Sequence, residues 1–284
     1  MPPDDAAFAS FERKWLEANP EQATVAVFLA PDERRRASAF GSLVHELEQT
    51  TFSVREPQVA AVKLNWWRQE LISAGAGKPR HPVTRELFDD ERARSIAESS
   101  WSNLIDGALA QLDGAAASAL PDSIATLAAF YQPVAALEAA LAADQPARTD
   151  ADARLWISAH LLHAAALTVD DRAIPLDLLA RHGLARSALI EPSPARSALL
   201  CDYLGLVQDE IDNALAQGSW ASLGRRVRAR LDRELAAKAR ATADPLAMLA
   251  SHPRQRRWRS LWLSWREARR SAVSEATRLP GRSQ

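Results

Sequence analysis

The sequence lacks the residues from which disulfide-bonded and cysteine-ligated proteins are built. Cys201 is the only cysteine among 284 residues, so an intrachain disulfide and a metal site made of cysteine ligands are both excluded. Glycine is scarce as well, with 10 residues, and runs of β-branched residues are short. Alanine, leucine, glutamate and arginine dominate instead, and these residues favour helices. The composition therefore predicts an all-α protein.

Long apolar stretches are also missing. No uninterrupted apolar run approaches the roughly 18 residues that a membrane-spanning helix requires, and the first residues, MPPDDAAFASFERKW, are acidic and mixed, unlike a signal peptide. Hydrophobic residues make up 47% of the chain and charged residues 25%, which is ordinary for a protein with a buried core. We expect a cytoplasmic protein, or one attached peripherally to the inner face of a membrane.

The charge is distributed unevenly along the chain. The overall net charge is −1, but residues 225–284 hold 16 Lys and Arg against 5 Asp and Glu, a net charge of +11. A basic end on an acidic remainder predicts contact with an anionic partner, either phospholipid, an acidic protein or nucleic acid. Because no recognised nucleic-acid-binding module accompanies these residues, we expect no nucleic-acid partner.

Apolar residues recur at helical spacing from end to end, and prolines interrupt the pattern. There is no repeat of fixed period and no alternating strand pattern, so residues 1–284 are predicted to form one domain of roughly ten helices. Residues 75–82 read as a loop, and the residues after 278 as a frayed tail. The predicted helices are 31–49, one starting at 57, then 83–95, 96–112, 121–143, 150–168, 175–182, 193–217, 220–241 and 244–275.

Several segments resemble the squalene/phytoene synthase family in the order that the family has them. They lie within residues 8–190 and are Phe28–Arg35, Leu64–Leu71, Lys78–Val83, Leu104–Gly107 and Ile174–Leu184. The resemblance implies a single-domain helical bundle around a central cavity, of the isoprenoid-synthase type. It also implies joining of two prenyl diphosphates, with Mg²⁺ held between two Asp-rich helical segments.

The first Asp-rich segment is altered in this sequence. Acids four residues apart share a helix face and can ligate one metal cluster. Glu48 stands where the first Asp belongs, but Phe52 stands where the second belongs, and His45 takes the place of the preceding basic residue. A phenyl ring offers no lone pair to a metal, so this segment is degenerate.

The second segment, His160–Asp171, is altered too. Leu167 occupies the place of its leading Asp, while Asp170 and Asp171 correspond to the acidic pair at its end. We therefore expect no established catalytic residue and no cofactor unless the chain is active, in which case Glu48, Asp170 and Asp171 would bind Mg²⁺. The candidates for substrate binding are His45, Tyr131 and His163.

Two functions follow from the resemblance. The first is a pseudoenzyme that acts as an assembly or scaffold factor on a protein partner, or that binds a prenyl lipid without converting it. The run Glu46–Gln49, followed by a tryptophan-containing helix, resembles the family's non-catalytic branch, the mitochondrial complex I assembly factor. The alternative is a divergent prenyl transferase that condenses two farnesyl or geranylgeranyl diphosphates with Mg²⁺.

Two further pairs of residues have a functional and a structural interpretation. His160 and His163 are spaced so that both could bind one metal, but we prefer the interpretation that they line the cavity. Trp66 and Trp67 could stack on a ligand, yet adjacent helical residues point to different sides. We expect one of the two indoles in the core and the other partly exposed.

The segment 253–275 is predicted to form a basic amphipathic helix. Trp258, Leu261, Trp262 and Trp265 fall on one face, and most arginines, including Arg259, lie elsewhere. The tryptophans and Arg259 could contact a membrane interface that contains anionic lipid. The preferred interpretation is the commoner one, a terminal helix whose aromatic face packs on the domain.

Overall fold

Helices account for the regular structure of the chain. The computed structural model describes residues 3–114, 116–142, 149–166, 173–217, 222–251 and 257–278, and in these ranges it contains α-helices, three short turns of other helix types and no β-strand. The α-helices are α1 (Pro3–Ala18), α2 (Glu21–Val25), α3 (Pro31–Glu48), α4 (Pro57–Gly75), α5 (Pro82–Asp89), α6 (Glu91–Ser95), α7 (Glu98–Ala110), α8 (Leu120–Ala142), α9 (Thr149–Ala166), α10 (Leu176–Arg181), α11 (Pro194–Ala216), α12 (Leu223–Arg240), α13 (Pro245–Ser251) and α14 (Arg257–Arg278). The all-α prediction is confirmed.

Most predicted helix boundaries agree with the structure to within a few residues. The predicted helix 83–95 is two helices, because the Asp90 side chain accepts a hydrogen bond from the Arg92 amide and starts α6 in a new direction. The predicted helix 244–275 is also two helices, α13 and α14. Helix α1, which the sequence analysis left unassigned, packs against α3 and α5.

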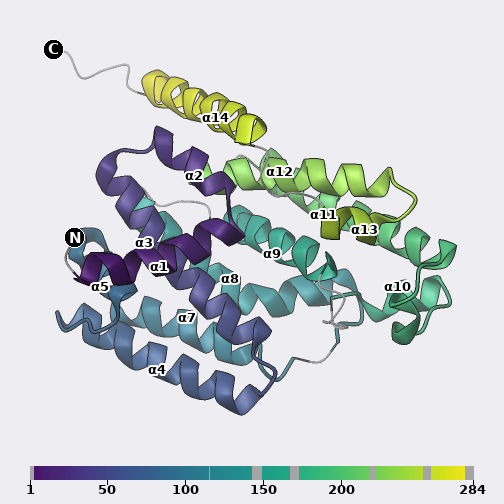
Figure 1. Cartoon of the computed structure of the whole chain (residues 1–284), viewed down its shortest axis with the longest axis horizontal. Helices are drawn as coiled ribbons and strands as arrows, with labels where there is room; N and C mark the ends of the chain where they lie inside the picture. The colour runs from purple at the N-terminus through teal and green to yellow at the C-terminus, as the bar shows by residue number, and fades with distance from the viewer. Residues whose placement is uncertain are drawn as a thin grey trace.

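Helix α8 lies at the centre of the bundle (Figure 1). It packs against α7 and α9 and contacts α3, and its buried side chains include Phe130, Tyr131 and Val134. Figure 1 shows α4 and α7 on one side of α8, and α9 and α12 on the other. This central position lets α8 present residues both to the core and to the cavity described below.

The crossing of α7 and α8 is very close, and Gly107 makes it possible. A Cβ atom at Gly107 would overlap the carbonyl oxygen of Ala129 on α8. That carbonyl lies four residues before Pro133, which is inside α8 and has no N–H to donate to it. The glycine therefore allows α7 to cover a stretch of α8 whose helical hydrogen-bond ladder is interrupted.

Among the described residues, one helix is long and apolar enough to cross a membrane. In α8, a window of 18 residues reaches a mean hydropathy of 1.4, with 39% of the window buried in the fold. The sequence analysis did not single it out because Gln132 and Glu138 interrupt its apolar run. Its buried residues pack against α7 and α9, and the core helix of a globular bundle meets the same criterion.

Helix α14 differs from the preferred expectation in the face that it buries. Its buried residues are Ser260, Leu263, Ser264 and Glu267, whereas Trp258, Trp262 and Trp265 are 85%, 43% and 44% exposed. The prediction that the aromatic face packs on the domain is therefore wrong. Small serine side chains face α2 and α12 instead, where they permit a close approach between helices.

The paired tryptophans of α4 behave as expected. Trp67 is buried in the core, and Trp66 is half-exposed on the outer side of the helix. Their rings are in edge contact, and both also contact the imidazole of His81. The contacts with a neighbouring side chain favour the structural interpretation over stacking on a ligand.

Candidate functional site

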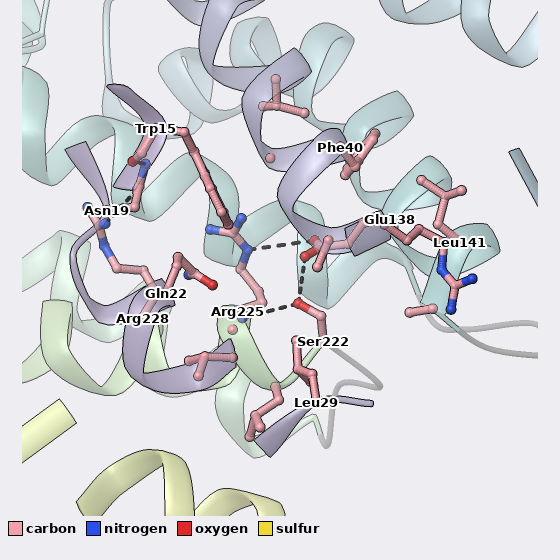
Figure 2. Close-up of a pocket in the computed structure, with 18 of the residues that line it drawn as sticks. Trp15, Asn19, Gln22, Leu29, Phe40, Glu138, Leu141, Ser222, Arg225 and Arg228 are labelled. Carbon is pink, nitrogen blue, oxygen red and sulfur yellow. Dashed lines mark hydrogen bonds and ion pairs between the residues drawn. The ribbon is translucent and has the colours of Figure 1, made fainter. Parts of the chain in front are cut away.

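A cavity opens between the N-terminal helices and the central bundle, as the resemblance implies. It contains about 860 Å³ of space not occupied by atoms, including its mouth. Its walls come from α1, α2, α3, α8, α9 and the first turns of α12. Figure 2 shows Trp15 and Phe40 on one side of the cavity and Arg225 projecting into its middle.

Helix α3 brings the first predicted motif to this cavity. The helix begins with Pro31 at its first turn, where the free N–H groups favour the nearby acids Asp32 and Glu33. It ends at Glu48, and the chain continues in a π turn, Gln49–Ser53. His45 and Glu48 lie one turn apart and both line the cavity.

Glu48 is held by a hydrogen-bond network at the inner end of the cavity. The Tyr131 hydroxyl lies 2.8 Å from Glu48 Oε1, to which it donates, and 3.0 Å from His160 Nδ1. Phe52 completes the group, with its ring parallel to that of Tyr131 and its centroid 4.3 Å from that of His160. Glu48 and Phe52 therefore lie on the same side of the chain, as their spacing predicts. Their neighbours there are the rings of Tyr131 and His160.

Burial shifts the protonation equilibria of this group toward neutral forms. Burial raises the pKa of Glu48, although Tyr131, Arg225 and Arg228 each lower it in part. Burial and, to a smaller extent, His163 lower the pKa of His160 to about 4. Burial also lowers the pKa of His45, so this residue supplies less positive charge than the basic residue that it replaces.

A second group centres on Glu138 of α8. Its carboxylate accepts hydrogen bonds from Trp156 Nε1 at 2.8 Å and from Ser222 Oγ at 2.6 Å. Arg225 of α12 lies with its Nε 3.7 Å from Glu138 and its guanidinium carbon 3.1 Å from the centroid of the Trp156 ring. Figure 2 shows the contacts of Glu138 with Ser222 and Arg225. Arg225 Nε is buried and has no hydrogen-bond partner among the described residues, so one N–H of this cation is free to donate.

The third group centres on Arg228, one turn further along α12. Arg228 pairs with Glu21 Oε1 at 3.0 Å and with Asp232 Oδ2 at 2.9 Å, and it also donates to His163 Nε2. Although burial raises the pKa of Asp232, Arg228 and His163 lower it to about 2. Burial opposes the charge on Arg228 too, but Asp232 and Glu21 raise its pKa above the ordinary value. Arg228 is therefore paired with two carboxylates, Glu21 and Asp232, in an internal ion network.

The described residues of this cavity include no cluster of ligands for a magnesium ion. No three acidic, histidine or cysteine side chains in the described part of the chain converge on a common point. Arg225 and Arg228 act electrostatically on Glu48, and they would repel a divalent cation placed beside it. Three of the predicted positions, Leu167, Asp170 and Asp171, lie outside the described residues.

The two histidines of α9 contact different side chains. His160 contacts Tyr131, whereas His163 contacts Asp232 at 3.1 Å and Arg228. The preferred interpretation, that they are polar residues around the cavity, agrees with these contacts. The Tyr131 and His163 side chains bond to other side chains of this chain, whereas His45 and Glu48 line the cavity.

Sequence reasoning missed Arg225, Arg228, Glu138 and Trp156. The two arginines were counted only as part of the basic C-terminal end, for which we expected an external anionic partner. They point inward instead and meet carboxylates of α2, α8 and α12. The available signal was their spacing of three residues, which places both side chains on one helix face.

Comparisons with known proteins bear on the fold. No protein-family model and no curated protein matches the sequence. A dehydrosqualene synthase in complex with a ligand superposes with a TM-score of 0.70 at 14% identity, covering 95% of this chain and 98% of that one. The chain has the all-α isoprenoid synthase fold. Squalene synthase HpnC from Alicyclobacillus acidocaldarius superposes with a TM-score of 0.58 at 15% identity, covering 87% and 92% of the two chains.

Proposed function

We propose that this chain binds a prenyl lipid with an uncharged oxygen head group and does not join prenyl diphosphates. The observation that carries the proposal is the charge of the cavity wall. The lining includes three glutamates, Glu33, Glu48 and Glu138, and the same number of arginines, Arg36, Arg225 and Arg228. A wall that balances its own charges gains little from a trianionic diphosphate, whose binding needs an excess of cations or metal ions.

The rest of the lining suits a hydrocarbon chain. Trp15, Phe40, Val44, Leu141 and Trp156 contribute apolar surface to the cavity. A branched prenyl chain would bury its methyl groups against these side chains at about 25 cal/mol per Å² of apolar surface removed from water.

Arg225 supplies a place for the head group. Its buried Nε–H has no hydrogen-bond partner in the described part of the chain, and such a group is costly unless something accepts from it. The oxygen of an alcohol or of a carbonyl is an acceptor without charge. Such an oxygen would accept from the cation without adding a negative charge beside Glu138.

A head-group series tests the proposal. We expect the purified protein to bind farnesol or geranylgeraniol, to bind the matching hydrocarbon farnesene more weakly, and to bind both alcohols equally with Mg²⁺ or with EDTA. Quenching of tryptophan fluorescence reports the binding, since Trp15 and Trp156 line the cavity. Tight binding of farnesyl diphosphate that requires Mg²⁺ would refute the proposal.

A matched pair of variants locates the ligand. Ala37 is exposed at the cavity wall on α3, and Ala237 is exposed on α12 away from the lining. Ala37→Trp is expected to fill the mouth and weaken binding of the alcohol at least about tenfold. Ala237→Trp adds the same side chain elsewhere and is expected to leave binding unchanged. Equal effects of the two variants would contradict binding in this cavity.

A divergent prenyl transferase is the second candidate, and the open cavity beside Glu48 favours it. If active, it would work through Glu48, Asp170 and Asp171 with Mg²⁺. The test is incubation with farnesyl and geranylgeranyl diphosphate, Mg²⁺ and NADPH, followed by extraction of hydrocarbons. We expect neither squalene- nor phytoene-type product. A product that disappears in the Glu48→Gln variant would establish this second function.

The likeness to the complex I assembly branch supports one part of the proposal, the loss of catalytic activity. That branch is the family's non-catalytic one, and Phe52 in place of an acid agrees with such a loss. A scaffold protein would contact its protein partner through its outer surface, and this contact would not require a ligand in the cavity. A stable complex that forms equally well with Ala37→Trp would support that role over lipid binding.

A further inference from the structure

The most unusual surface of this molecule is the outer face of α14. Helical residues advance by about 100° each, which places Trp258, Trp262 and Trp265 within an arc of about 60°. This arc lies opposite the buried face formed by Leu263 and Glu267. The tryptophans are 85%, 43% and 44% exposed, and a contiguous exposed aromatic strip of this kind marks an interaction surface.

Arginines accompany the tryptophans along the same face. Trp262 lies between two guanidinium groups, with Arg259 at 4.9 Å and Arg266 at 4.6 Å from its ring centroid. Arg269 lies 4.9 Å from the centroid of Trp265. These contacts cover part of each ring with a cation while the rest of the ring stays exposed. Aromatic rings and cations therefore form one surface.

The helix has more cations than its acids can balance. Arg230, Arg266 and Arg270 all bind the same buried carboxylate, Glu267, at distances of 2.8 to 3.3 Å. Three guanidinium groups on one carboxylate leave a net positive charge near the helix surface. A partner for this face has to be anionic and able to accept indole rings.

We propose that α14 docks the protein on an anionic phospholipid surface through Trp258, Trp262 and Trp265. Indole rings prefer the headgroup level of a bilayer, and arginines beside them can reach the phosphates. Each arginine near an anionic bilayer contributes about 1 kcal/mol of attraction, and the indoles add apolar burial. An acidic protein surface would satisfy the arginines, but it offers no layer into which three adjacent indoles insert.

The inner face of α14 connects this surface to the cavity wall. Leu263 packs in a small cluster with Val25 of α2 and with Leu223 and Val227 of α12. Val25 and Leu223 also line the cavity. Figure 1 shows α14 at the edge of the molecule beside α12 and α2. Docking through α14 would thus leave α14 itself between the bilayer and the residues of the cavity wall.

Vesicle flotation of the full chain tests the docking. We expect binding to vesicles in which roughly one third of the lipid is phosphatidylglycerol, and much less to vesicles of phosphatidylcholine alone. Binding should weaken as the salt concentration rises, because salt screens exposed charges. Failure to float with the phosphatidylglycerol vesicles at low salt would overturn the proposal, even if α14 captured an acidic protein.

Variants identify the surface that binds. The combined change Trp258→Ser, Trp262→Ser and Trp265→Ser is expected to weaken vesicle binding at least about tenfold, because all three indoles leave the interface. Arg269→Glu places an acid within the strip and should have a similar effect. Trp66→Ser removes a half-exposed indole from α4, on the far side of the bundle in Figure 1, and should have none. Circular dichroism checks that each variant is folded.

The variants also keep this proposal separate from the cavity ligand. Ala37→Trp should lose lipid-alcohol binding and still float with anionic vesicles, because α14 is untouched. The triple tryptophan variant should bind the lipid alcohol when it is added in detergent, but it should no longer float with anionic vesicles. Undiminished flotation of the triple variant would refute docking through α14, whatever the cavity binds.

Discussion

The pKa of His160 gives a quantitative prediction about acid stability. The folded protein holds the pKa of this imidazole at about 4, because burial disfavours its charged form, against an ordinary value of 6.5. Below pH 6.5 the unfolded chain takes up a proton at this position and the folded chain does not. The folded state therefore loses stability as the pH falls from 6.5 to 4. Above pH 6.5, the stability that the neutral imidazole contributes is fully present.

The size of the effect follows from the shift. Each pKa unit is worth about 1.4 kcal/mol, so the loss from this one group is up to about 3 kcal/mol between pH 6.5 and 4. The groups around it come from different helices: Tyr131 of α8 contacts it, His163 of α9 acts on it electrostatically, and Glu48 of α3 shares the Tyr131 hydroxyl. The raised pKa of Glu48 acts in the opposite direction, because the folded state takes up its proton first as the pH falls.

A comparison of variants isolates the contribution of His160. Urea denaturation is measured between pH 4.5 and 7 for the native chain and for His160→Asn. Asparagine keeps a polar group near the Tyr131 hydroxyl but does not titrate. We expect the unfolding free energies of the two proteins to converge as the pH falls. Parallel curves for His160→Asn would refute the reasoning about burial.

Three stability predictions concern the packing around the site. Gly107→Ala should cost about 1–3 kcal/mol in thermal unfolding, because its methyl group would overlap the Ala129 carbonyl. Arg228→Met should cost about 3–5 kcal/mol in urea denaturation, because Asp232 would remain buried without its cation. Leu263→Ala should cost about 2–4 kcal/mol and should speed hydrogen exchange mainly in α14, which it anchors.

The helices could be predicted from the sequence because their signals are local. Proline at the first turn of α3, α4, α5 and α11 fixes where each of these helices starts. The break between α5 and α6 was missed because it depends on one side-chain bond, from Asp90 to the following turn. A single asparagine or aspartate inside an apolar-periodic stretch is compatible with either a cap or a continuous helix.

The face of α14 that packs on the domain could not be predicted from periodicity. A helical pattern identifies the aromatic strip, but it does not decide which strip meets the domain. Ser260 and Ser264 are buried beside Leu263, and the Ser264 hydroxyl bonds the Ser260 carbonyl within the helix. This local bond satisfies a polar group that a sequence pattern places on the outside.

Only the part of the candidate site that comes from α3 could be predicted from the sequence. Glu48 was located through a motif and lines the cavity, whereas Phe52 packs against Tyr131 and His160. The cations that decide the chemistry of the cavity, Arg225 and Arg228, come from a helix far along the chain. Their orientation is set by Glu138 and Glu21, and pairing across such sequence distances leaves no periodic signal.

The two proposals constrain each other through the charge of the molecule. A cavity whose arginines and glutamates balance favours an uncharged lipid, and such a lipid is poorly soluble in water and is found in membranes. On α14, by contrast, Arg266 and Arg270 share the single carboxylate of Glu267 with Arg230, and the inner face of this helix contacts Val25 and Leu223 of the cavity wall. Positive charge is thus balanced in the cavity and in excess on α14. An uncharged ligand taken from an anionic bilayer would require this division of charge.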